Sequence, residues 1–238
     1  MKEIAVIGHR ANSSRILRFY RAVKAGIIEI DVRRINQEIK VIHGPSDVKR
    51  ATPIGEAFSR IDYILFYRDP LLPPMTLKEY LQRLNGFRGV MIDIVGEIDA
   101  EELLNQIPDN KHISYYFSST NHCILKELKK LRSNIFTSAT LQEKLIDPAT
   151  EVRFCEADAA TVKHTSLDRG TLEDLHKDGI KVIVWTVNDQ DEASHLAEMG
   201  VDAIITDRPD KIRRKLLYEG YYITDYLSYA LMGIPKHI

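Results

Sequence analysis

Acidic residues interrupt two otherwise apolar segments of the chain. Glu29 and Asp31 lie two positions apart at the run 27–30, and Asp93 lies inside the run 90–94. Because residues i and i+2 of a strand face the same way, we expect the Glu29 and Asp31 carboxylates to project together. Paired carboxylates repel each other, and a carboxylate in an apolar run is costly, unless a cation compensates them. These residues indicate one divalent cation, and oxygen ligands without cysteine favour Mg²⁺ or Ca²⁺ over Zn²⁺. A solvated strand end is the alternative for the first pair.

Two histidines and an arginine lie close in sequence to these acids. Gly8-His9-Arg10 directly follows the first apolar run, and His43 follows the short run 41–42. Histidine exchanges a proton near neutral pH, and a guanidinium group binds two phosphate oxygens at once through parallel hydrogen bonds. Phosphodiester cleavage needs one group that takes a proton and another that gives one. The residues therefore favour phosphodiester chemistry, although an ordinary loop pair would also explain His9 and Arg10.

The elements that must position these residues alternate along the chain. Short apolar runs separated by amphipathic stretches predict βα units around a parallel sheet. Strands are expected at 4–7, 27–30, 40–42, 63–66, 90–94, 113–117, 134–136, 152–155, 182–187 and 203–205, and helices at 13–24, 77–84, 100–106, 123–131, 172–177 and 191–199. About eight such repeats in 238 residues predict an α/β fold, a (β/α)8 TIM barrel spanning residues 1–238 as one domain. The carboxyl ends of its strands would share one mouth.

Local signals place some of the helix ends. Thr76 with Glu79 predicts a capping box, and Thr171 with Asp174 predicts a weaker one. Gly179 and Gly200 are expected to end helices. The irregular stretch 44–74 is expected as an excursion over the barrel mouth.

Composition excludes several classes of protein. The chain has 33 Lys and Arg against 34 Asp and Glu, so no net field attracts nucleic acid. Cys123 and Cys155 form no disulfide or zinc pattern, and both are expected in the core. The first apolar run is too short for a signal peptide, and no segment approaches the roughly 18 apolar residues of a membrane span. We therefore expect a cytoplasmic protein. Residues 210–238 are expected as a helical and then tyrosine-rich extension, docked on the barrel or serving an oligomer contact.

Longer stretches resemble one known family. His9-Arg10, then Ala-Gly-Ile-Ile-Glu-Ile-Asp-Val at 25–32, then Ile42-His43 resemble the opening block of glycerophosphodiester phosphodiesterases. Residues 74–79 resemble the helix before the family's third barrel strand, 172–188 look like its penultimate βα unit, and 200–209 are similar to its closing strand and turn. The likeness runs from about residue 4 to 210 in the family's order, which is more specific than any single motif.

The resemblance implies a TIM-barrel enzyme and a role for each candidate residue. By that likeness His9 and His43 are the acid–base pair, Arg10 binds phosphate, and Glu29, Asp31 and Asp93 hold the divalent cation. Trp185 would line the alcohol part of the substrate, or equally close the barrel core. The implied reaction is attack of a substrate hydroxyl on the adjacent phosphate, giving a cyclic phosphate and then glycerol 3-phosphate.

The chain departs from the family at three places. Ala11 replaces a usual glycine before a shortened loop, and His43-Gly44 stands where the family has His-Asp. These two features resemble the related sphingomyelinase D group of phospholipases. Val95 stands where the family has a lysine that neutralises phosphoryl charge, and Arg10 or Lys163 are the candidates to replace it. Two alternatives therefore stay open: a phospholipase D-like enzyme that releases a cyclic phosphate from a lysophospholipid-like substrate, and a catalytically impaired barrel that binds a phosphate ligand.

Other polar residues are expected to be structural. Ser118 and Ser119 end a strand and are expected as terminating or capping residues rather than phosphate contacts. Asp207 is expected to cap the helix that begins near Pro209 rather than to bond the mouth loops. The remaining histidines, at 112, 122, 164, 176, 195 and 237, have no metal-binding spacing and are assigned no chemistry.

Overall fold

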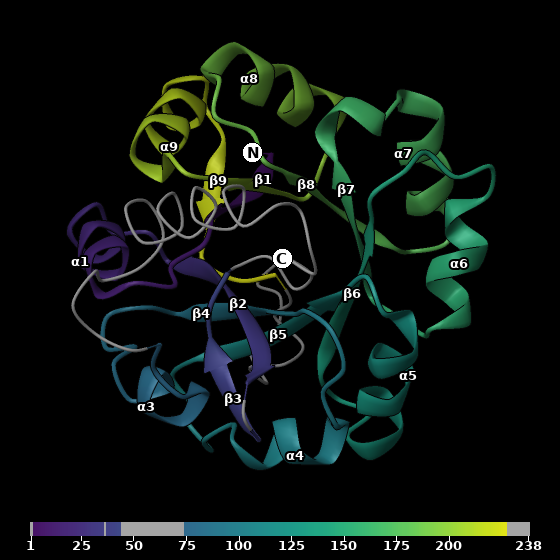
Figure 1. Cartoon of the computed structure of the whole chain (residues 1–238). Coiled ribbons are helices and arrows are strands. Elements are labelled where there is room, and N and C mark those ends of the chain that lie inside the picture. Colours follow the sequence, from purple (N-terminus) through teal and green to yellow (C-terminus); the bar gives the residue numbers. More distant parts are fainter. Residues whose placement is uncertain (1, 36, 44–73, 228–238) are drawn as a thin grey trace, which may run out of the picture.

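A computed structural model describes residues 2–35, 37–43 and 74–227, and eight of its strands close into a parallel barrel. In order around the barrel these are β1 (Glu3–Gly8), β2 (Ile27–Ile35), β4 (Gly89–Ile94), β5 (Ser114–Ser119), β6 (Phe136–Leu141), β7 (Ala159–Lys163), β8 (Lys181–Trp185) and β9 (Ala203–Thr206). β1 pairs with both β2 and β9 and so closes the ring. Figure 1 looks into this ring, the (β/α)8 barrel that the sequence predicts.

Helices surround the barrel on its outside (Figure 1). They are α1 (Ser14–Ala22), α3 (Leu77–Leu81), α4 (Ala100–Asn105), α5 (His122–Leu131), α6 (Pro148–Phe154), α7 (Arg169–Lys177), α8 (Gln190–Met199) and α9 (Pro209–Tyr218). The capping box of Thr76 and Glu79 is present, and Gly200 ends α8 with a φ of 108°. The expected cap at Thr171 is wrong, because Asp168 accepts the Thr171 N–H at 2.8 Å and caps α7.

Two expected strands are misplaced in the second half. Residues 152–154 belong to α6 and Cys155 is its C-cap, because Asp147 caps the start of that helix and Pro148 occupies its first turn. The strand that follows is β7, whose Ala-Ala-Thr-Val-Lys sequence carries little apolar signal. The strand expected at 134–136 begins only at Phe136. Cys123 is exposed on α5 rather than in the core, whereas Cys155 is buried as expected.

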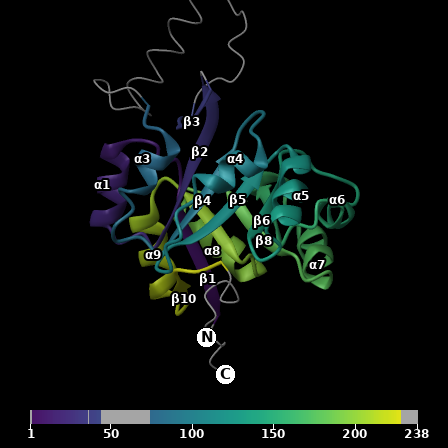
Figure 2. The ribbon, with the colours of Figure 1, turned by 90° about the horizontal axis from the view of Figure 1, so that it is seen from below.

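Two short strands extend the barrel at opposite ends. β3 (Glu38–Val41) pairs antiparallel with β2, so the strand expected at 40–42 is a hairpin arm, which rises from the top of the barrel in Figure 2. β10 (Tyr222–Thr224) pairs with β1, and the Leu227 N–H donates to the Tyr116 hydroxyl at 3.1 Å. The C-terminal extension therefore docks on the barrel as far as residue 227. The expected strand 63–66 and nearly all of the excursion 44–74 lie outside the described residues.

Alternation along the strands decides what faces the barrel interior. On β2, Ile28, Ile30 and Val32 pack outward with the helices, whereas Ile27 packs inside with Met91 and Tyr116. Glu29 and Asp31 follow Ile27 at alternate positions of β2, so their side chains also point into the barrel. Each lies one layer of side chains nearer the carboxyl end of the strand than the one before it. The barrel interior is thus apolar at its base and acidic toward its mouth. Among the described helices, none has both the length and the apolar character that crossing a membrane requires.

Candidate active site and metal centre

Three carboxylates from two neighbouring strands meet at the mouth. Glu29 and Asp31 come from β2 and are buried, and Asp93 comes from β4 and is half-buried. β2 and β4 pair with Asp31 directly beside Asp93, so the expected cluster forms, with one oxygen of each carboxylate within 4.8 Å of the others. This all-oxygen donor set fits one hard divalent cation.

Without a cation, the cluster does not favour three ionised carboxylates. Burial, then repulsion from Asp31 and Asp93, raises the pKa of Glu29 well above its usual range. Burial and the Asp31 charge raise the pKa of Asp93 to about 7, although a hydrogen bond from Ser118 at 2.8 Å opposes the shift. Burial would also raise the pKa of Asp31, but hydrogen bonds from His43 and Asn12 outweigh it and lower that pKa. A bound divalent cation would remove this repulsion.

The loop after β1 holds the β2 acids through backbone and amide groups. The Arg10 N–H donates to the Glu29 carboxylate at 2.6 Å, and the Ala11 N–H donates to the Glu29 carbonyl oxygen at 2.8 Å. Arg10 adopts a φ of 49°, a left-handed conformation that aims this N–H at the acid. The Asn12 amide donates to the Asp31 carboxylate at 2.6 Å and accepts the Asp31 N–H at 2.9 Å.

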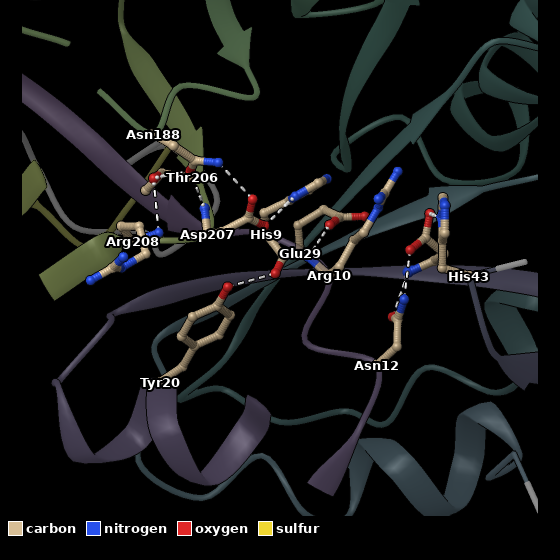
Figure 3. Close-up of polar contacts among 11 residues, drawn as sticks. His9, Arg10, Asn12, Tyr20, Glu29, His43, Asn188, Thr206, Asp207 and Arg208 are labelled. Atoms are coloured by element: carbon tan, nitrogen blue, oxygen red, sulfur yellow. Dashed lines mark hydrogen bonds and ion pairs between the residues drawn. The ribbon is translucent and has the colours of Figure 1, made fainter. Parts of the chain in front are cut away.

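Two buried tyrosines fix that loop from the helix side. The Tyr20 hydroxyl of α1 donates to the His9 carbonyl oxygen at 2.6 Å, and the Tyr80 hydroxyl of α3 donates to the Ala11 carbonyl oxygen. Gly8 makes this possible, because an added Cβ would lie only 2.7 Å from the Tyr20 ring. Figure 3 shows Tyr20 reaching the loop beneath His9.

His9 is oriented by Asp207, the residue that follows β9. Its Nδ1 lies 2.8 Å from an Asp207 oxygen, and the Asn188 amide donates to the other Asp207 oxygen at 2.7 Å. His9 and Asn188 approach Asp207 from different sides in Figure 3. Burial would raise the pKa of Asp207, but the His9 hydrogen bond and charge outweigh it and hold that pKa low. The expectation that Asp207 caps α9 is therefore wrong, since Arg208 is the N-cap residue.

His43 is oriented by the carboxylate cluster itself. Its Nδ1 lies 2.9 Å from an Asp31 oxygen, so Asp31 contacts both His43 and Asn12. Each histidine therefore has Nδ1 on a carboxylate, and donation from Nδ1 leaves the lone pair on Nε2. Figure 3 shows Glu29 and Arg10 between His9 and His43, so the two histidines approach the same part of the mouth, as the sequence predicts.

The other predicted residues occupy distinct places. Trp185 ends β8, is half-buried and packs against the apolar interior cluster, a position that fits both the substrate wall and the closing of the core. Lys163 is exposed at the end of β7, beside Trp185 in the strand register. Ser119 is structural, as expected, since its hydroxyl donates to the Ile94 carbonyl oxygen. Ser118 instead contacts the Asp93 carboxylate, contrary to expectation.

Sequence reasoning missed the residues that support the site. Asn12 and Asn188 carry no charge and match no metal-binding or acid–base pattern. Tyr20 and Tyr80 lie in amphipathic segments, where packing in the core is explanation enough for a tyrosine. One signal was available for Asp207. It directly follows a barrel strand, where side chains point into the mouth, and the same argument had selected His9.

Comparisons with known proteins agree with this geometry. A sequence profile of the glycerophosphoryl diester phosphodiesterase family matches residues 9–211. The protein YhdW of Bacillus subtilis (strain 168) is 28% identical in an alignment 239 positions long, which covers 87% of this chain and 96% of that protein. A glycerophosphodiester phosphodiesterase of Caldanaerobacter subterraneus subsp. tengcongensis is 26% identical over 235 residues, which cover 87% of this chain and 95% of that one.

Solved structures share the fold at lower identity. A phosphodiesterase of Oleispira antarctica, solved in complex with the product sn-glycerol-3-phosphate, superposes with a TM-score of 0.71 at 19% identity. The superposition covers 89% of this chain and 96% of that one. A glycerophosphodiester phosphodiesterase of Agrobacterium tumefaciens superposes with a TM-score of 0.68 at 21% identity, covering 89% and 99% of the two chains.

Proposed function

The chain belongs to the glycerophosphoryl diester phosphodiesterase family, and from this premise we propose that it hydrolyses glycerophosphodiesters to an alcohol and glycerol 3-phosphate. One observation carries the assignment of roles. Two histidines, each with Nδ1 on a carboxylate, lie at one mouth with a cluster of three carboxylates. This arrangement supplies two proton-transfer groups beside a site for a cation, which is what phosphodiester cleavage requires.

In the proposed reaction the residues of the chain orient the substrate and move protons. Arg10 binds phosphate oxygens, and Trp185 lines the alcohol part. One of His9 and His43 takes the proton from a substrate hydroxyl that attacks the adjacent phosphate, while the other protonates the leaving alcohol. Water then opens the cyclic phosphate, with the two histidines in exchanged roles. One Mg²⁺ or Ca²⁺ held by Glu29, Asp31 and Asp93 would withdraw charge from the phosphoryl oxygens as a Lewis acid.

The experiment that tests this proposal identifies the product and the required ion. Glycerophosphodiesters with different head groups are incubated with the protein in Mg²⁺, Ca²⁺ or chelator, and products are followed by phosphorus NMR. We expect glycerol 3-phosphate, formed only when a divalent cation is present. A persistent cyclic phosphate would instead identify the phospholipase D-like reaction, and absence of turnover with every head group would identify the impaired barrel. The cytoplasmic location and an oligomer contact through the tyrosine-rich tail stay predictions.

A further inference from the structure

Arg33 continues the inward-facing row of β2 beyond the acids. Glu29, Asp31 and Arg33 alternate along the strand, so their side chains leave the same face. β2 and β4 pair Asp31 with Asp93 and Val32 with Ile94, and the Val95 N–H donates to the Val32 carbonyl oxygen at 3.0 Å. The next pair in this register is Arg33 with Val95. A half-buried cation thus lies one layer above the carboxylate cluster, beside an apolar residue.

Other cations near this position are directed elsewhere. Arg34 leaves the opposite face of β2 and pairs with Glu102 of α4. Lys40 lies across from Arg33 in the β2–β3 hairpin, and its ammonium pairs with Glu38 at 3.0 Å. Arg33 leaves β2 on the same face as Glu29 and Asp31, toward the mouth. Arg10 reaches Glu29 from the β1 side, because its N–H donates to that carboxylate at 2.6 Å.

The charge balance of the loaded site calls for two cationic side chains. Three ionised carboxylates and one divalent cation leave one negative charge, and a phosphodiester adds a second. Further negative charge develops on the phosphoryl oxygens during the reaction, where fixed cations act most strongly. Arg10 supplies one compensating charge. The residue that follows β4 supplies none, because Val95 stands where the family has a lysine.

We propose that Arg33 is a second phosphate-binding residue, which grips the phosphoryl group from the β2 side while Arg10 grips it from the β1 side. This inference rests on the proposed function and deepens it, because it assigns recognition of the anion to a pair of guanidinium groups. Such groups bind phosphate oxygens bidentately, which a single ammonium does not. Lys163 ends β7, which is not a neighbour of β2 or β4 in the barrel, so it is not the replacement in this arrangement.

The test compares neighbouring arginines on opposite faces of one strand. Arg33→Ala, Arg33→Lys and the control Arg34→Ala are titrated with sn-glycerol 3-phosphate at saturating Mg²⁺ by calorimetry, and Mg²⁺ alone is titrated separately. We expect Arg33→Ala to weaken binding of the phosphate ester about 10–100-fold, Arg33→Lys to lie between, and Arg34→Ala to match the unmodified protein. Binding of Mg²⁺ to Arg33→Ala should be unchanged or tighter, because a nearby positive charge has been removed.

Different results would contradict the role of Arg33 and the proposed function. Weaker binding of both Mg²⁺ and the phosphate ester to Arg33→Ala would mean a merely structural role and would overturn the proposal. So would equal ester binding by Arg33→Ala and Arg34→Ala. Arg33→Met retains the apolar stem and replaces Arg33→Ala if that variant does not fold. If the unmodified protein neither binds the ester nor cleaves any glycerophosphodiester, the proposed function fails and this inference fails with it.

Discussion

The two sides of the barrel mouth satisfy their polar groups in opposite ways. At β6 and β7, Ser138 and Thr161 are both buried and share a hydrogen bond of 2.6 Å between neutral hydroxyls. At β2 and β4, Asp31 and Asp93 lie side by side in the strand register and repel each other. The first contact joins two neutral groups by a hydrogen bond, whereas the second places two like charges next to each other. Interactions that stabilise the fold and interactions that prepare it for chemistry are therefore segregated around one ring.

The largest expected effect comes from removing the histidines of the charged side. We expect His9→Ala and His43→Ala each to lower kcat about 10²–10⁴-fold, because each removes one of two proton-transfer groups. Steady-state kinetics on a glycerophosphodiester measures the loss. His122→Ala is the matched control, since His122 also directs Nδ1 to a carboxylate, that of Glu151 at 2.7 Å, but lies at the start of α5. If His122→Ala loses as much activity as His9→Ala, the contrast between the two sides is wrong.

A smaller loss is expected from Asp207→Asn. Asp207 orients His9 without touching the cluster, and carboxylates that orient a functional histidine commonly contribute about 10–100-fold. The variant should lower kcat by that factor and leave the Mg²⁺ affinity unchanged. Kinetics combined with a Mg²⁺ titration separates the two effects. A parallel loss of Mg²⁺ binding would show that Asp207 supports the whole site rather than His9.

The stability of the metal-free protein should fall as the pH rises through the raised pKa of Asp93. The fold raises the pKa of Asp93 to about 7, so it favours the protonated carboxyl. In the metal-free protein this penalty is absent below about pH 4, grows as the pH rises, and is complete above about pH 7. We therefore expect the gain in melting temperature on adding Mg²⁺ to be larger at pH 8 than at pH 5. Equal gains at both pH values would contradict the assigned cluster.

One substitution on each side of the mouth, at Asp93 and at Thr161, should change stability in opposite directions. Asp93→Asn should stabilise the metal-free protein at pH 8, by on the order of 1 kcal/mol or more, because it removes a repelling charge. Thr161→Val should destabilise it by about 1 kcal/mol, because it leaves the Ser138 hydroxyl without its partner. Denaturant unfolding in chelator measures both. Destabilisation by Asp93→Asn would show that its bond with Ser118 outweighs the repulsion.

The smallest expected effect is that of Trp185→Phe. An apolar wall contributes similarly to the ground state and the transition state, so we expect KM to rise several-fold while kcat changes little. A large loss of stability with unchanged KM would instead assign Trp185 to closing the barrel core.

The sequence predicts side-chain positions better within the strands than in the segments that follow them. The inward alternation of Glu29 and Asp31 is a local property of β2, and it places both acids correctly from the sequence. The sequence around Val152, Phe154 and Cys155 predicts a strand where α6 forms, because a short apolar run does not distinguish a strand from one face of a helix. The role of Asp207 is ambiguous in sequence, because helix capping and histidine orientation use the same residue type after a strand.

The amino-acid sequence by itself determined the barrel, the inward direction of the acids and histidines, and the kind of ion they suit. These follow from periodicity and side-chain chemistry, which act over a few residues. Only the tertiary structure decided that Asp207 holds His9 across 198 positions of sequence and that Asn12 holds Asp31. It also decided that β2 and β4 pair in a register that places Asp31 directly beside Asp93. Such pairings depend on the register and closure of the barrel, which join strands distant in the chain.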